Sequence, residues 1–194
     1  MAEFKALTSG VEINGETTYS IVDGMGVFRI CALEILAKYG ITKPKKGFWY
    51  SQQAWLDSFK EISAMLGPTT LFAIGKKIPA NAIFPPSIDN IDKALQAIDV
   101  AYHMNHRLTG VVMFNPGTGK MLEGIGHYQY NKIGDNKVKM FCDNPYPCEF
   151  DRGIIEAMAQ KFKSETSSSA VTVHDDSCPC RRKGGDSCTY HVTW

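Results

Sequence analysis

The amino-acid sequence predicts an α+β fold, in which an antiparallel sheet, made of a meander and a C-terminal hairpin, packs with four to five helices in a single domain. The first half of the 194-residue chain carries apolar side chains at helical spacing. The second half contains runs of β-branched and aromatic residues that glycine-containing turns separate. A chain of this length buries a core without disulfide staples.

The composition is that of an ordinary globular protein, with 44% hydrophobic and 21% charged residues. Lysine plus arginine number 21 and aspartate plus glutamate 20, so the net charge of +1 creates no overall attraction to nucleic acid or anionic membranes. No apolar stretch reaches about eighteen residues, and the first residues lack the apolar core of a signal peptide. We therefore expect a cytoplasmic protein with no membrane span and no direct binding to nucleic acid.

Two parts of unequal length are expected along the chain. Residues 1–20 are predicted to form an N-terminal arm, a hairpin that turns at Asn14 and Gly15, because Asn-Gly is the strongest short turn signal. Residues 21–194 are predicted to form the ligand-binding domain. Its last segment, 142–194, contains most of the candidate metal ligands.

The expected elements follow from the spacing of apolar residues. Helical periodicity predicts helices over 21–39, 48–66, 88–105 and 149–162. Alternation predicts strands over 108–115, 120–132, 137–142 and 170–173, and a final strand from residue 188. The run 69–74 is too short for periodicity to separate a strand from a helix. Three prolines within 78–86 predict a loop there.

Soft metal ligands gather near the C-terminus, where Cys178, Cys180 and Cys188 accompany His174. The glycines between Cys180 and Cys188 let the chain double back. Cys148 opens a predicted helix, whose dipole would lower the pKa of its thiol. Because zinc takes four sulfur or nitrogen donors, we predict a structural zinc site of Cys148, Cys180 and Cys188 with His174 or Cys178 as the fourth ligand. Disulfides or free buried thiols are the alternative interpretation.

The same segment resembles a known family. Asn-Pro-Tyr-Pro before Cys148, the strand that ends in His174, and Cys-Arg-Arg-Lys-Gly-Gly-Asp-Ser-Cys from Cys180 to Cys188 are similar to the C-terminal signature of 4-vinyl reductase domains. This family includes the sensory part of phenol-responsive transcription activators. The resemblance implies a zinc ion held by the three cysteines. A serine stands where the phenol sensors have a glutamate ligand, so His174 or Cys178 must replace it.

A second set of side chains predicts a ligand pocket. Trp49 and Trp55 belong to an aromatic-rich run, and Tyr102, His103 and His106 lie at the end of a later helix. His103 and His106 are three residues apart, so both fall on nearly one helix face, as a metal pair or a ligand-polarising pair requires. We predict that the five residues line the rim of an apolar pocket. Core packing of the rings, and histidines that complement a helix dipole, are the alternatives.

Motifs for catalysis are missing from the sequence, which has no GxSxG, HExxH, paired-carboxylate or Rossmann glycine pattern. We therefore expect a sensor or carrier domain rather than an enzyme, with a hydrophobic or aromatic small molecule as its ligand. The family resemblance implies a homodimer. Such a sensor would act through a separate signalling or enzyme partner.

Three rival functions stay open at this point. The resemblance also implies an accessory protein or reductase in tetrapyrrole metabolism, although no nicotinamide or flavin motif accompanies it. The Cys178 and Cys180 pair, together with Cys188, forms a candidate thiol redox switch. Thiolate ligands also suit iron, in an iron–sulfur cluster or a haem, so the same cysteines support an iron-based or haem-based sensor.

Overall fold

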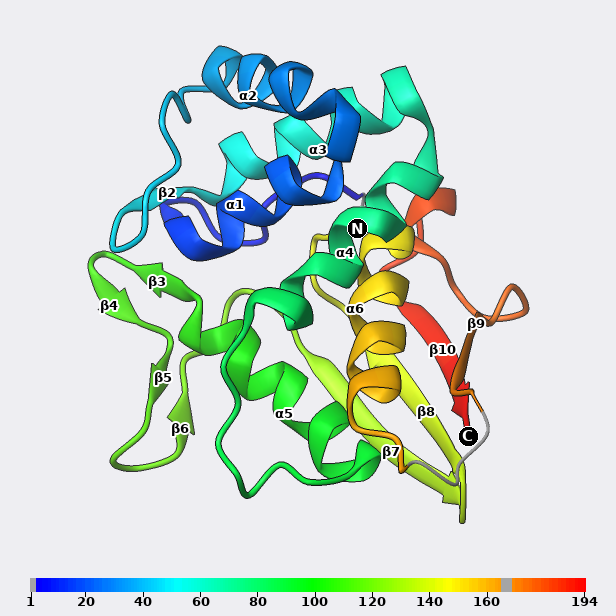
Figure 1. Ribbon diagram of the computed structural model, residues 1–194. Coiled ribbons are helices and arrows are strands. Elements are labelled where there is room, and N and C mark those ends of the chain that lie inside the picture. The colour runs from blue at the N-terminus through cyan, green and yellow to red at the C-terminus, as the bar shows by residue number, and fades with distance from the viewer. Residues whose placement is uncertain (1–2, 165–168) are drawn as a thin grey trace.

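Two four-stranded antiparallel sheets organise the chain (Figure 1), and the computed structural model describes residues 3–164 and 169–194. The first sheet has the order β2 (Trp49–Ser51), β1 (Val11–Asn14), β3 (His106–Leu108), β4 (Val111–Val112). The second has the order β7 (Tyr128–Gly134), β8 (Lys137–Cys142), β10 (Cys188–Thr193), β9 (Val171–His174). A small ribbon pairs β5 (Phe114–Asn115) with β6 (Lys120–Met121).

Six α-helices occur in the described residues, and together with the sheets they confirm the expected α+β class. They are α1 (Gly15–Gly24), α2 (Arg29–Lys38), α3 (Gln52–Leu66), α4 (Pro68–Asn81), α5 (Ile91–Met104) and α6 (Cys148–Lys161). Figure 1 shows α1, α2 and α3 together at one end of the molecule, whereas α6 lies over the face of the second sheet. None of the helices in the described ranges has both the length and the apolarity that a membrane crossing requires.

The predicted N-terminal hairpin is wrong. Asn14 does not form a turn but caps α1, because its side-chain oxygen accepts a hydrogen bond from the backbone N–H of Thr17 at 2.9 Å. Asparagine is as good a helix cap as a turn residue, so the local signal was ambiguous. Tertiary pairing decides the outcome, since β1 forms its ladder with β2 and β3, both far away in sequence.

The helix expected over 21–39 is divided into two in the structure. A Cβ atom on Gly24, the last residue of α1, would lie 2.5 Å from the Cα atom of Ile74 in α4. Gly26 follows with a φ of +50° in a short 3-10 turn, η1 (Gly26–Phe28), and α2 then starts in a new direction.

The run 69–74 is helical, and α4 continues through Pro79 into the segment expected to be a loop.

The second sheet matches the sequence expectation in part. The strand expected at 137–142 is β8 with unchanged bounds, and β10 pairs with both β8 and β9 as the end of the chain. The strand expected over 120–132 divides into β6 and β7, because Gly124 and Gly126 between them have positive φ values of +117° and +75°. The meander and the final hairpin therefore share one sheet.

Glycines allow α4 and α6 to approach until their backbones touch. A Cβ atom on Gly153 of α6 would lie 2.3 Å from the carbonyl oxygen of Phe72, and one on Gly75 of α4 would lie 2.2 Å from the carbonyl oxygen of Phe150. This contact fixes the position of α6, which forms a wall of both candidate sites described below.

Replacing Gly153 by alanine should therefore lower the free energy of unfolding by about 2–3 kcal/mol, because the added methyl group forces two packed helix backbones apart. Urea denaturation measures the change. Gly117→Ala is the control, since its Cβ would meet only the side-chain oxygen of Asn115, at 3.3 Å. Equal stability of the two variants would contradict the close packing.

Candidate functional site

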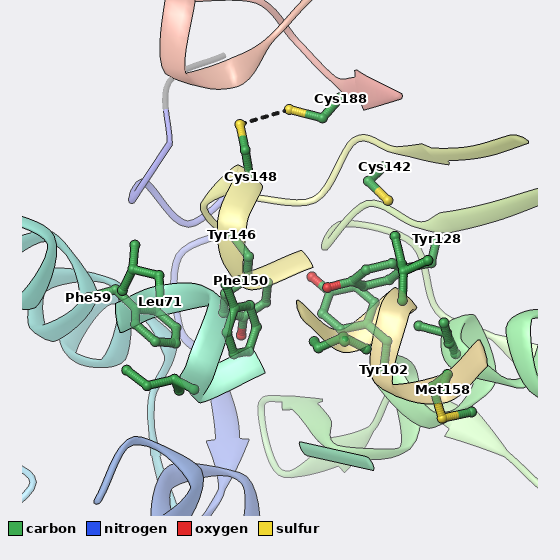
Figure 2. Close-up of a cluster of buried hydrophobic side chains, with 14 of the residues drawn as sticks. Phe59, Leu71, Tyr102, Tyr128, Cys142, Tyr146, Cys148, Phe150, Met158 and Cys188 are labelled. Carbon is green, nitrogen blue, oxygen red and sulfur yellow. Dashed lines mark hydrogen bonds between the residues drawn. The ribbon is translucent and has the colours of Figure 1, made fainter. Parts of the chain in front are cut away.

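Three cysteines and one histidine form a compact cluster at the start of α6. The Sγ atom of Cys148 lies 3.0 Å from that of Cys188 and 3.4 Å from that of Cys180, and Figure 2 shows Cys148 and Cys188 pointing toward each other. One ligand atom of His174 joins the three sulfurs, and all four atoms lie within 4.8 Å of one another. A tetrahedral zinc ion separates two thiolates by about 3.8 Å, so this arrangement is close to that of a metal site.

His174 rather than Cys178 completes the group. The Nδ1 atom of His174 lies 3.1 Å from a carboxylate oxygen of Asp176, while its buried Nε2 atom has no hydrogen-bond partner. A carboxylate behind one ring nitrogen and a free second nitrogen is the usual arrangement of a histidine metal ligand. The Sγ atom of Cys178 instead donates to Asp175 at 3.3 Å.

The charges around the cluster favour a thiolate at Cys188. Hydrogen bonding from Cys148 lowers the pKa of Cys188, and Arg181 lowers it further, since its Nε–H and its backbone N–H each donate to the sulfur at 3.4 Å. The pKa of Cys148 is raised, first by its bond to Cys188 and then by burial and the carboxylate of Glu3. The lowered pKa expected at Cys148 is therefore found at Cys188 instead, and its causes are Cys148 and Arg181 rather than a helix dipole. Glu3, which the sequence did not indicate, accepts from the N–H of Cys148 at 3.0 Å.

A buried polar network connects this cluster to the centre of the molecule. Arg181, with 2% of its surface exposed, donates to the carboxylate of the fully buried Asp151 and to Asn144. The other carboxylate oxygen of Asp151 accepts from the hydroxyl of Tyr128 at 2.6 Å. Burial raises the pKa of Asp151 to about 6, against the opposite effect of Arg181.

An apolar cavity of about 90 Å³ lies deeper along α6. Its walls come from β1, β3, β7, α1, α4, α5, α6 and the loops that follow α4 and precede α6. They include the apolar side chains of Ile78, Phe84, Ile98, Phe150, Ile154 and Met158. Figure 2 shows Tyr102, Tyr128, Tyr146 and Phe150 gathered in this part of the core, with Cys148 and Cys188 further along. A side chain such as Met158 adapts readily to different ligands.

One buried histidine supplies a polar acceptor to this cavity. The Nδ1–H group of His106 donates to the carbonyl oxygen of Tyr102 at 2.7 Å, which leaves the Nε2 lone pair to accept from the hydroxyl of Tyr146, also at 2.7 Å. Burial lowers the pKa of His106 to about 4, so the ring is neutral at pH 7. The hydroxyl of Tyr146 also receives a longer contact, of 3.4 Å, from Gln52.

The structure brings together only two of the five residues predicted for the pocket. Tyr102 and His106 line the cavity. His103 is fully buried but turns to Asp99 and His127, Trp55 packs in the core against Phe59, and the ring of Trp49 lies under the guanidinium of Arg107.

Tyr146 was missed because it stands inside Asn-Pro-Tyr-Pro, a segment that sequence reasoning treats as a turn. An aromatic residue between two prolines was the available signal, since both prolines hold the backbone extended.

Comparison with known proteins identifies the architecture. An Fe(II) unliganded H-NOX protein from K. algicida has a TM-score of 0.64 at 11% identity, over 93% of this chain and 96% of that chain. The chain has the H-NOX fold. A structure from work on heme distortion in the H-NOX family gives 0.63 at 13% identity, over 94% and 95% of the two chains. An oxygen complex of an H-NOX domain related to soluble guanylate cyclases gives 0.59 at 12%, over 92% and 91%.

These likenesses correct the resemblance drawn from the C-terminal motif. No protein-family model and no curated protein matches the chain. The similar solved structures are H-NOX domains and not 4-vinyl reductase or phenol-sensor domains, so that resemblance is wrong. The motif covered only the last third of the chain, and a cysteine cluster can recur on different folds, whereas the H-NOX likeness spans nearly the whole backbone. These neighbours are described with iron or heme and not with zinc.

Acid should destabilise the protein through His106. The unfolded chain binds a proton near pH 6.5, whereas the folded chain accepts it only near pH 4. The stabilising contribution of neutral His106 is therefore complete above pH 6.5 and is lost as the pH falls toward 4, a loss of about 3 kcal/mol. Urea denaturation at pH 7 and pH 4 measures it. In His106→Gln, which does not titrate, the fall should be smaller by that amount; an unchanged fall would contradict the buried neutral ring.

Proposed function

We propose that this chain is a small-molecule-binding sensor or carrier domain, whose ligand enters the apolar cavity and bonds to His106 and Tyr146. The observation that carries this proposal is the Nε2 acceptor of His106 facing the hydroxyl of Tyr146 within mostly apolar walls. Binding sites for small molecules typically combine apolar walls with a few polar groups that orient the ligand. A ligand hydroxyl would accept from one partner and donate to the other.

The size of the cavity limits the ligand to a compact molecule. Its volume of about 90 Å³ is smaller than the engineered cavity of about 150 Å³ that binds benzene. A ligand with one aromatic ring therefore requires the lining side chains to shift, and Met158 is the most adaptable of them. A phenol-sized molecule with one hydroxyl group is compact enough for the cavity and can bond to His106 and Tyr146.

Homodimerisation and a separate signalling partner stay predictions.

The cysteine cluster is proposed to hold a structural zinc ion through Cys148, His174, Cys180 and Cys188. Three sulfurs and one imidazole nitrogen form a closed tetrahedral set, and such sets stabilise folds rather than catalyse reactions. The unpartnered Nε2 atom of His174 supports this ligand set, since burial without a partner is costly unless a metal ion or another group binds it. This site would join β9, β10 and α6 at the end of the sheet.

Haem is the rival ligand, because the structural neighbours are described with heme or Fe(II). His106 offers the chemistry of an axial ligand, a neutral ring whose second nitrogen is held by a backbone carbonyl. The rest of the cavity does not fit. Its volume is far below that of a porphyrin, and among the described residues that line it none is a lysine or arginine that would pair with two propionates.

Phenol should bind about 5-fold more tightly than toluene, because only phenol forms a hydrogen bond with the His106 and Tyr146 pair. Isothermal titration calorimetry measures both affinities. His106→Leu should remove the difference, whereas Trp49→Ala, which changes a residue outside the cavity lining, should keep it. If neither phenol nor toluene binds to the wild-type chain, the proposed ligand class is wrong.

Titration with hemin tests the rival proposal, that the chain binds haem. We expect no stoichiometric Soret band, since the cavity lacks the volume and the cationic partners. A band at one equivalent that His106→Ala abolishes would replace the small-molecule proposal with a haem-binding one.

Cobalt substitution tests the cysteine site. Co²⁺ bound to thiolates should give a near-ultraviolet charge-transfer band in the wild-type chain, and Cys180→Ser should weaken this band and lower the melting temperature by about 10 °C, because one metal ligand is lost. Cys31→Ser is the control, since this cysteine lies in α2, away from the cluster. A variant with an unchanged band would contradict the ligand set.

A further inference from the structure

Three side chains away from the cysteine cluster form a second group of metal-ligand type. Asp99 and His103 lie one turn apart on α5, and His127 stands immediately before β7. One ligand atom from each of the three lies within 4.8 Å of the other two. The imidazole rings of His103 and His127 face each other with centroids 4.9 Å apart. These residues come from two elements that the fold brings together.

One ring nitrogen of His103 has no hydrogen-bond partner and is free to bind a metal ion. Its Nδ1 atom lies 2.9 Å from the backbone carbonyl oxygen of Asp99, and because a carbonyl can only accept, Nδ1 carries the proton. The Nε2 atom is then a lone-pair donor for a metal, yet it is fully buried and has no hydrogen-bond partner. Across residues 3–164 and 169–194, the only buried histidine nitrogens without a partner are those of His103 and His174. Both belong to clusters of metal-ligand residues.

Two carboxylates add negative charge around the histidines. Asp99 is held by the backbone N–H of Tyr128 at 2.9 Å, and its second oxygen lies 2.9 Å from Nδ1 of His127. Glu123, with its side chain 80% exposed, approaches Nε2 of His127 to 3.1 Å from the solvent side. Two anionic oxygens beside two imidazoles form an environment that attracts a divalent cation.

We propose that Asp99, His103 and His127 bind a first-row transition-metal ion, with Zn²⁺ as the expected occupant and Glu123 near the solvent-facing position. Two imidazole nitrogens and a carboxylate oxygen suit zinc, cobalt, nickel or iron(II), whereas calcium and magnesium prefer oxygen ligands alone. Three protein ligands leave a coordination position open, unlike the closed set at Cys148. The site is independent of the proposed cavity ligand.

Titration with Co²⁺ tests this site on the full chain, after the cysteine site has been filled with one equivalent of Zn²⁺. A second equivalent should bind with visible d–d bands and without the thiolate charge-transfer band. In His127→Ala the affinity for this equivalent should fall at least about 100-fold, because one of three ligands is removed. His191→Ala is the matched control, since His191 also pairs with a carboxylate, that of Asp175 at 3.0 Å, but stands outside the cluster. It should bind Co²⁺ as the wild type does.

A wild-type chain that takes up no second equivalent overturns the proposal, as does a folded His127→Ala variant that binds it unchanged. Proton NMR of the cobalt-loaded wild-type chain provides the second measurement and needs no variant. Paramagnetic Co²⁺ should shift the ring protons of both His103 and His127 far outside their normal range. Unshifted rings in the presence of the bound second equivalent would overturn the site.

Discussion

The buried ion pair between Asp151 and Arg181 is the constraint on which the rest of the structure depends. Removing two charges from water costs several kcal/mol per ion, and this cost is recovered only when every partner is in place. Tyr128 and Asn144 supply the remaining hydrogen bonds, and the same guanidinium reaches the sulfur of Cys188. β7, α6, the loop before it and the cysteine cluster must therefore dock together. A partly docked arrangement would leave a buried charge unpaired.

Helix α6, which carries Asp151, contributes residues to both candidate sites. Its first residue, Cys148, belongs to the metal-ligand cluster, and Phe150, Ile154 and Met158, which follow within the next three turns, form a wall of the cavity. Gly153 lets α4 pack against this helix at backbone contact. The cavity and the cluster thus share one helix.

Local patterns predicted the elements that depend on local physics. The strand at 137–142, the helices near 52–66, 91–104 and 148–161, and the gathering of Cys148, Cys180 and Cys188 could all be predicted, because periodicity and a glycine-rich turn act over short distances. The hairpin at Asn14 could not, since the same residue caps a helix once β1 has found β2 and β3. Most of the predicted pocket residues also fell elsewhere, because helix spacing places a side chain on a face but does not say what that face meets.

The sequence by itself determined the α+β class and the three cysteines of the cluster. Only the tertiary structure decided the H-NOX fold, the position of His174 rather than Cys178 beside the three cysteines, and the separation of His106 from His103 into a cavity and a second cluster. The physical reason is the same in each case. Each of these features depends on contacts between elements distant in sequence: only such contacts shield Nε2 of His174 and of His103 from water without giving either atom a hydrogen-bond partner.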